Sequence, residues 1–281
     1  MRWTTLWASV LLMLTACQPG KPEPDPSPVE TRAAVLDWES SDITLPIDAY
    51  GMSRAEIHRV EAAASIELAR CVTRQDRVSD DVVAEARRAI EPLRPDHWAT
   101  HWLFGFWNAD YIAAHGWRPF PEGPEPPSWI DADESTISSC LERDPLTTLQ
   151  PVHSSMTDSA STLLMEINGE SLERAEGTEE FTALISQRAS CVTEKGHRTD
   201  SDSSLRNVEF PAEDEESMLR AALVEAQCSD FLGVTQRLGD LVANFQTDLI
   251  REHRAELLSV KAEADSRVAR ANKILAEVGI Q

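Results

Sequence analysis

Two histidines four residues apart, His97 and His101, have the spacing with which a helix presents two imidazoles to one metal ion. The zinc-protease version of this motif needs a glutamate after the first histidine as general base, but Trp98 occupies that position. Candidates for the third ligand that a metal site would need are His115, Asp96 and Asp110. The alternative is a pair of partly exposed histidines beside an aromatic core. A metal-dependent hydrolase is therefore our alternative hypothesis, and a protein without catalysis or cofactor is the one we favour.

Four of the five cysteines lie between residues 71 and 228, and their even number in an exported chain indicates two disulfide bonds. They are Cys71, Cys140, Cys191 and Cys228. Four cysteines allow three pairings. We favour Cys71–Cys140 and Cys191–Cys228, because each bond then closes one half of the chain. No Cys-x-x-Cys pair occurs, which argues against zinc and thioredoxin-like sites.

Aromatic side chains are concentrated in the first half of the chain. The aromatic residues that could contact a ligand are Trp98, Trp102, Trp107, Tyr111 and Trp117. Rings of this size bury large areas, so we expect most of them to fill the core. The alternative is an exposed platform for a sugar or for apolar groups of a partner protein, and this stretch is our candidate binding surface.

The chain begins with one positive charge at Arg2 and an apolar run that is too short to cross a bilayer but suits a secretory signal. Leu14-Thr15-Ala16-Cys17 ends this run and resembles the lipobox of bacterial lipoproteins, in which cleavage before the cysteine accompanies its acylation. The resemblance implies a mature chain that begins at a lipidated Cys17. An ordinary secretory signal, with Cys17 left as a free thiol, is the alternative.

The net charge of −22 makes electrostatic binding to nucleic acid or anionic headgroups unfavourable, so we expect no nucleic-acid partner. Gly-x-Ser-x-Gly, phosphate-binding glycine loops and dinucleotide fingerprints are all missing from the sequence. Among 48 acidic residues no pair of carboxylates stands out as catalytic.

Three- and four-residue apolar spacing recurs through the chain, and no strand-like alternation of any length occurs. The pattern predicts an all-α fold, with Ser53, Asn108 and Thr178 as helix caps and a bend near Gly233. Asn168-Gly169 predicts a turn. One helix of 45 residues is expected over 234–278, packed along both halves of the protein or paired with a second copy of the chain.

These patterns divide the chain into four parts. They are a signal peptide at 1–16, a lipidated cysteine with a proline-rich disordered tether at 17–36, a helical half at 37–150, and a second helical half at 151–281. The aromatic cluster belongs to the first half and the long C-terminal helix to the second.

Several motifs together resemble a group of poorly characterised exported lipoproteins of actinobacteria. They are the lipobox, the proline-rich tether, the stretch from Cys191 to Gly196, Ala226-Gln227-Cys228, and the charged run from Gln246 to His253. This resemblance implies no catalytic residues. We expect a lipid-anchored protein on the extracytoplasmic face of the cell membrane, with a binding or structural role toward an envelope protein or glycan. For the C-terminal helix we prefer packing within one molecule, because Glu252 and His253 interrupt the apolar seam; homo-oligomerisation through this helix is the alternative.

Overall fold

The structure is a computed structural model that describes residues 32–90, 100–101, 104–116, 134–152, 161–200, 207–210 and 214–281. These ranges are mainly helical, as the sequence predicts. The α-helices are α1 (Arg54–Thr73), α2 (Asp80–Ile90), α3 (Ala109–His115), α4 (Glu134–Leu141), α5 (Thr162–Glu176), α6 (Glu179–Glu194), α7 (Glu215–Leu232), α8 (Val234–Glu252) and α9 (Arg254–Glu277). The shorter elements are β1 (Val35–Asp37), β2 (Asp42–Thr44), β3 (Thr100–His101), β4 (Gly105–Phe106), and the 3-10 helices η1 (Pro46–Tyr50) and η2 (Leu146–Thr148).

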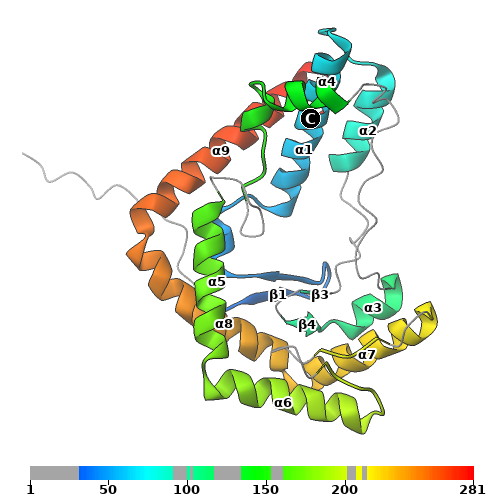
Figure 1. The fold of residues 1–281 in the computed structure, drawn as a ribbon, viewed down its shortest axis with the longest axis vertical. Helices are drawn as coiled ribbons and strands as arrows, with labels where there is room; N and C mark the ends of the chain where they lie inside the picture. The colour runs from blue at the N-terminus through cyan, green and yellow to red at the C-terminus, as the bar shows by residue number, and fades with distance from the viewer. Residues whose placement is uncertain are drawn as a thin grey trace, which may run out of the picture.

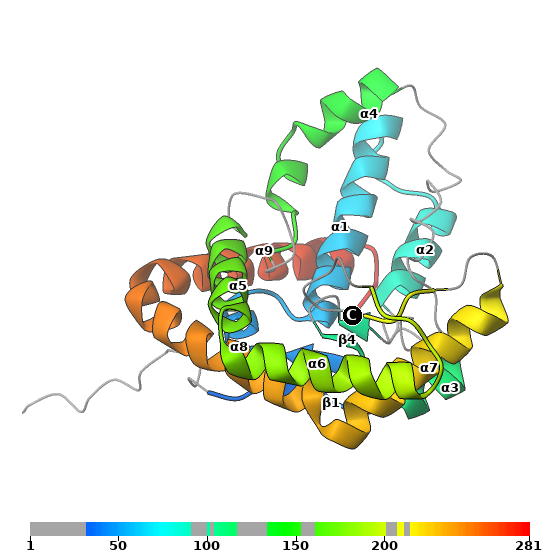
Figure 2. The same ribbon diagram turned by 60° about the horizontal axis from the view of Figure 1, so that its bottom comes forward.

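The helices are arranged in two groups at opposite ends of the molecule (Figure 1). At one end α1 packs against α2, α4 and the C-terminal helix α9. At the other end α6 and α7 pack together, and Figure 2 shows them lying across the base of the molecule. Helices α5 and α8 lie side by side and connect the two groups.

Two hydrophobic cores stabilise this arrangement, and neither follows the expected boundary at 150/151. The larger core combines Val60 and Ile66 of α1 with Leu164 of α5 and Leu275 of α9. The smaller core joins residues of the aromatic segment to α6 and α7. Its members are Phe106, Tyr111, Ile112, Val192, Val208, Ala221, Ala222, Ala226 and Cys228. Each core therefore needs residues from both halves of the sequence.

Helix termini lie where the capping residues predict them. Ser53 and Glu56 form a reciprocal capping box at α1, and the side chains of Asn108 and Thr178 accept backbone N–H groups at the starts of α3 and α6. Gly233 ends α7 with φ +60°, the left-handed conformation that glycine adopts without strain.

The expected turn at Asn168-Gly169 is wrong, because both residues lie inside α5. Asn168 is buried, and its side-chain oxygen accepts a hydrogen bond from Gln246 Nε2 of α8 at 3.0 Å. This contact satisfies the amide that would otherwise favour a turn, so tertiary packing overrides the local preference.

Two short antiparallel hairpins, β1–β2 and β3–β4, accompany the helices. Their strands have two or three residues, too few to show a period of two in the sequence. The first hairpin also shows that the fold begins before residue 37. Ala34 N donates to Asp240 Oδ1 at 3.0 Å, and Gln236 Nε2 donates to Ala34 O at 3.0 Å, which ties the N-terminal strand to α8.

The single helix expected over 234–278 is also corrected, because the chain bends at His253 between α8 and α9. His253 has φ −104° and ψ 19°, outside the α-helical range. The bend falls at the polar pair Glu252-His253, where the apolar stripe is interrupted. As a result α8 packs on α5 while α9 packs on α1, and the C-terminal region still spans both groups of helices.

Candidate functional site

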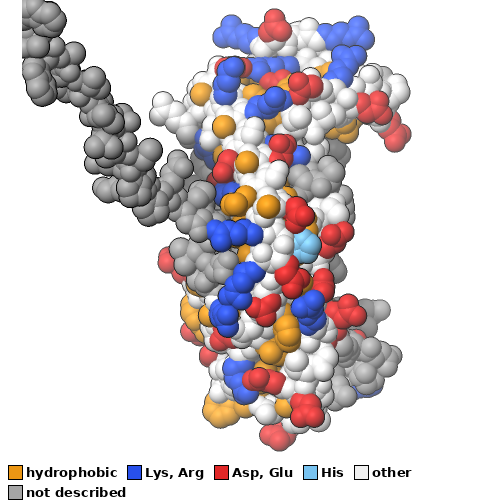
Figure 3. Space-filling model, turned by 90° about the vertical axis from the view of Figure 1, so that its left-hand side faces the viewer, with side chains coloured by type: hydrophobic (Ala, Val, Ile, Leu, Met, Phe, Trp, Pro, Cys, Tyr) orange, Lys and Arg blue, Asp and Glu red, His pale blue; other side chains and the backbone are white. Residues whose placement is uncertain are grey.

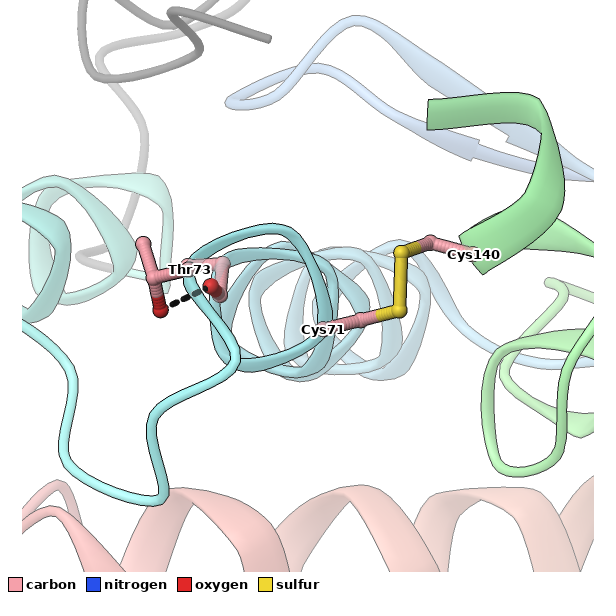
Figure 4. Close-up of a disulfide and its surroundings, with 4 residues drawn as sticks. Cys71, Thr73 and Cys140 are labelled. Atoms are coloured by element: carbon pink, nitrogen blue, oxygen red, sulfur yellow. Dashed lines mark hydrogen bonds between the residues drawn. A yellow bond between two sulfur atoms is a disulfide. The ribbon is translucent and has the colours of Figure 1, made fainter. Parts of the chain in front are cut away.

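Both disulfides have the pairing that we favoured from the sequence. Cys71 in the last turn of α1 is bonded to Cys140 of α4, as Figure 4 shows. Cys191 of α6 is bonded to Cys228 of α7. The Cα atoms are 5.9 Å apart in each bond, so each disulfide holds two helix ends in close contact. Beside each disulfide lies an open groove.

The groove beside Cys71–Cys140 has a volume of about 700 Å³ and is rich in charged side chains. Its basic residues are Arg70, Arg74 and Arg143. Arg74 and Arg143 each follow a disulfide cysteine by three positions, and each donates its backbone N–H to the carbonyl of that cysteine, at 3.2 and 3.0 Å. Each arginine is thus anchored at one of the two cysteines of the same disulfide.

Most acidic side chains of this groove are already paired with cations. Glu67 and Glu277 lie 2.5 and 3.2 Å from the same nitrogen of Arg70. Asp144 is paired with Arg270, outside the groove, at 2.7 Å. Among the described residues, in contrast, no carboxylate lies within ion-pair distance of Arg74 or Arg143.

The groove beside Cys191–Cys228 is smaller, about 390 Å³, and has a different character. The residues three positions after its cysteines are Glu194 and Phe231. Phe231 is 85% exposed, so this groove presents an apolar ring and a carboxylate where the first presents two guanidinium groups. The two grooves share their position beside a disulfide and differ in size and chemistry.

A buried ion pair lies next to the second disulfide. Arg188 and Glu225 each precede a cysteine of that bond by three residues, and neither has exposed surface. The carboxylate oxygens of Glu225 accept from the backbone N–H groups of Phe106 at 3.2 Å and Val208 at 2.6 Å, and Arg188 lies 3.8 Å away. Arg188 also donates to the carbonyl of Phe104. The pair therefore attaches the aromatic segment to α6 and α7.

Opposing effects act on the ionisation of this pair. Burial raises the pKa of Glu225, while Arg188 and the two backbone N–H donors act in the opposite direction. Burial likewise lowers the pKa of Arg188, and Glu225 opposes this shift. Because both oxygens of Glu225 accept hydrogen bonds from N–H groups, the geometry fits the ionised carboxylate.

Only part of the aromatic candidate surface lies within the described residues. Trp107 is 1% exposed and Tyr111 is 4% exposed, so the interpretation as core is confirmed for both and neither can serve as a contact surface. Trp107 packs edge-on against Trp38 at 4.9 Å between ring centroids. Trp98, Trp102 and Trp117 lie outside the described residues and stay predictions.

The roles of the remaining sequence candidates are not tested by the geometry. Cys17 and His97 lie outside the described residues. His101 lies in strand β3, paired with Gly105 of β4, which corrects the expectation that it lies on a helix. Within the described residues no group of three or more His, Cys, Asp or Glu side chains could hold a metal ion. None of the described helices has the length and apolar character of a membrane span.

The arginine pair and the buried ion pair were missed in the sequence, although each has a signal there. Cys-x-x-Arg occurs at both Cys71 and Cys140, and Arg-x-x-Cys and Glu-x-x-Cys precede the second pair. In a helix these spacings place two side chains on neighbouring positions of one face. The spacing places each flanking residue beside its own cysteine, and the packing of the helices decides which of them share a groove.

Comparisons with known proteins supply no relative. No family model, no curated protein and no solved structure matches this chain.

Proposed function

We propose that this protein is a lipid-anchored binding module on the extracytoplasmic face of a bacterial cell membrane, without catalytic activity. The observation that carries the proposal is the use of the cysteines. Four of the five are joined in two disulfides, which form and persist in oxidising compartments. The fifth, Cys17, ends the signal-like segment at the position that a lipoprotein would acylate.

The two open grooves support a binding role. They lie at opposite ends of the molecule, beside the contacts that the disulfides hold rigid, and they present side chains of different chemistry. The disulfides fix the backbone on which these side chains lie, which reduces the conformational entropy that the chain loses when a ligand binds.

The proposal is tested by the intact mass of the protein isolated from its native membrane, before and after reduction and alkylation. We expect a lipid adduct on the fragment that begins at Cys17, and four cysteines that react only after reduction. Substitution of Cys17 by serine, Cys17→Ser, should abolish the adduct and release the protein from membranes. An unmodified N-terminus, or four thiols that react without reduction, would contradict the proposal.

A further inference from the structure

We propose that the groove beside the Cys71–Cys140 disulfide binds a phosphate group through the guanidinium groups of Arg74 and Arg143. This inference deepens the proposed binding role by naming the chemistry of one ligand, and it rests on that role. It does not depend on the lipid anchor, so the two can fail separately.

The two arginines follow helices α1 and α4, which the Cys71–Cys140 disulfide joins. Arg74 caps α1 in the left-handed conformation, with φ +54° and ψ +36°, and Arg143 lies just beyond α4. The backbone N–H of each is bonded to a cysteine of the same disulfide, whose Cα atoms are 5.9 Å apart. Both side chains are exposed and both line the groove, so one ligand can contact both.

Most carboxylates of the groove are paired with arginines other than Arg74 and Arg143. Glu67 and Glu277 share an ion pair with Arg70, and Asp144 is paired with Arg270. Asp76 is then the one lining carboxylate outside these pairs, against two arginines with no carboxylate partner among the described residues. The end of the molecule that carries α4 also shows more Lys and Arg than acidic side chains on the face drawn in Figure 3. In a protein of net charge −22 this groove is locally balanced, because its four carboxylates are matched by Arg70, Arg74, Arg143 and the neighbouring Arg270.

The shape of the guanidinium group favours phosphate. Arginine presents parallel N–H donors in a planar fork that matches two oxygens of one phosphate, and two arginines can engage one group together. The second disulfide groove, with Glu194 and Phe231 at the equivalent positions, has no such donors. Positive side chains also stabilise helix C-termini, but that role alone gives no affinity for phosphate.

The test is calorimetric titration of the full-length chain, kept in a neutral detergent at low ionic strength, with inorganic phosphate. The variants are Arg143→Gln, Arg74→Gln and the double variant. Arg87→Gln on α2, which removes the same charge from an exposed site outside the groove, is the matched control. Circular dichroism and the number of disulfides establish that each variant is folded. Arg143, unlike Arg74, does not occupy the left-handed cap of α1, so Arg143→Gln keeps the test valid even if Arg74→Gln disturbs the end of that helix.

We expect the wild type and Arg87→Gln to bind phosphate equally, each groove variant to bind about tenfold or more weakly, and the double variant to show no binding. Micelles containing phosphatidylglycerol or phosphatidylcholine then identify the source of the phosphate. Displacement of inorganic phosphate only by phosphatidylglycerol points to a lipid headgroup, and no displacement points to a soluble phosphate; either result supports the proposal. Absence of binding to the wild type, or equal binding by the folded double variant, would overturn it.

Discussion

Arg188 and Glu225 are charged side chains without exposed surface, and their surroundings limit what can replace them. Both oxygens of Glu225 accept from backbone N–H groups that belong to distant segments, at Phe106 and Val208. A buried pair is weak evidence for net stabilisation, but removal of one partner leaves the other charge uncompensated. The pair thus makes the position of the aromatic segment dependent on one carboxylate.

We expect Glu225→Gln to lower the free energy of unfolding by about 3 to 5 kcal/mol. The amide would turn an N–H donor toward one of the two backbone donors and leave Arg188 buried without a counter-charge. Urea unfolding followed by circular dichroism measures the change. Glu216→Gln, in an exposed ion pair with Arg220, is the control and should change stability by less than about 0.5 kcal/mol. Equal effects of the two substitutions would contradict this account.

Gly105 lies against the same pair and has φ +74°. A Cβ atom there would lie 2.1 Å from Glu225 Oε1 and 2.9 Å from Asn207 Oδ1. We expect Gly105→Ala to destabilise the protein by at least about 2 kcal/mol, because it adds a steric clash to an unfavourable backbone conformation. Gly233→Ala has a similar positive φ in open space and should cost only about 1 kcal/mol. Thermal unfolding of both variants separates the clash from the backbone effect.

Among the helices, α8 shows how one element can serve two neighbours. Its buried face contacts α5 through Gln246 and the N-terminal strand through Gly239 and Asp240. The bend at His253 then turns the chain so that α9 can follow α1. A straight helix of the same length would direct its C-terminal half away from α1, so the bend allows one sequence segment to cover both groups of helices.

Gly239→Ala and Gly169→Ala should have opposite effects on stability. Both glycines are helical, but a Cβ at Gly239 would lie 2.6 Å from the Cβ of Ala34, whereas Gly169 faces open space. We expect Gly169→Ala to stabilise the protein by about 0.5 to 1 kcal/mol through helix propensity. Gly239→Ala should destabilise it by about 1 to 2 kcal/mol, because the N-terminal strand must shift.

Limited proteolysis distinguishes this mechanism from general destabilisation. In Gly239→Ala the segment around Ala34 should become the first cleavage site, and in Gly169→Ala the pattern should match the wild type. Stabilisation by both substitutions would show that Ala34 does not pack against α8.

In the complete molecule, the apolar stripe of α9 is already covered by its own chain. Leu257, Ala264 and Leu275 have no more than 1% exposed surface. Little of the stripe is left for a second copy, although the sequence pattern alone permits a coiled coil.

We therefore expect a constant monomer mass across protein concentrations in light scattering, measured on detergent-solubilised protein with the detergent contribution subtracted. A mass that rises with concentration and falls when Phe231, the exposed ring of the second groove, is changed to serine would contradict this expectation. It would place the contact at that groove rather than along α9.

Much of the fold can be predicted from residues that are close in sequence. The caps at Ser53, Asn108 and Thr178 and the end at Gly233 are confirmed, since each depends on hydrogen bonds within about four residues. The turn at Asn168-Gly169 and the single continuous helix over 234–278 are wrong, because an amide partner on another helix and the packing of α9 on α1 outweigh local preferences. Of the candidate site, the disulfide pairing was predicted and the arginines beside it were not.

By itself the sequence determined the helical class and several helix ends, because capping and apolar periodicity are expressed within short stretches. It favoured the pairing of the cysteines that the structure has, but left two other pairings open. Only the tertiary structure decided that Arg74 and Arg143 share one groove, that Glu225 holds the aromatic segment, and that both cores cross the middle of the chain. These features join residues tens of positions apart, and their contacts depend on how whole helices pack. Local spacing cannot specify that packing, since many arrangements bury the same apolar faces.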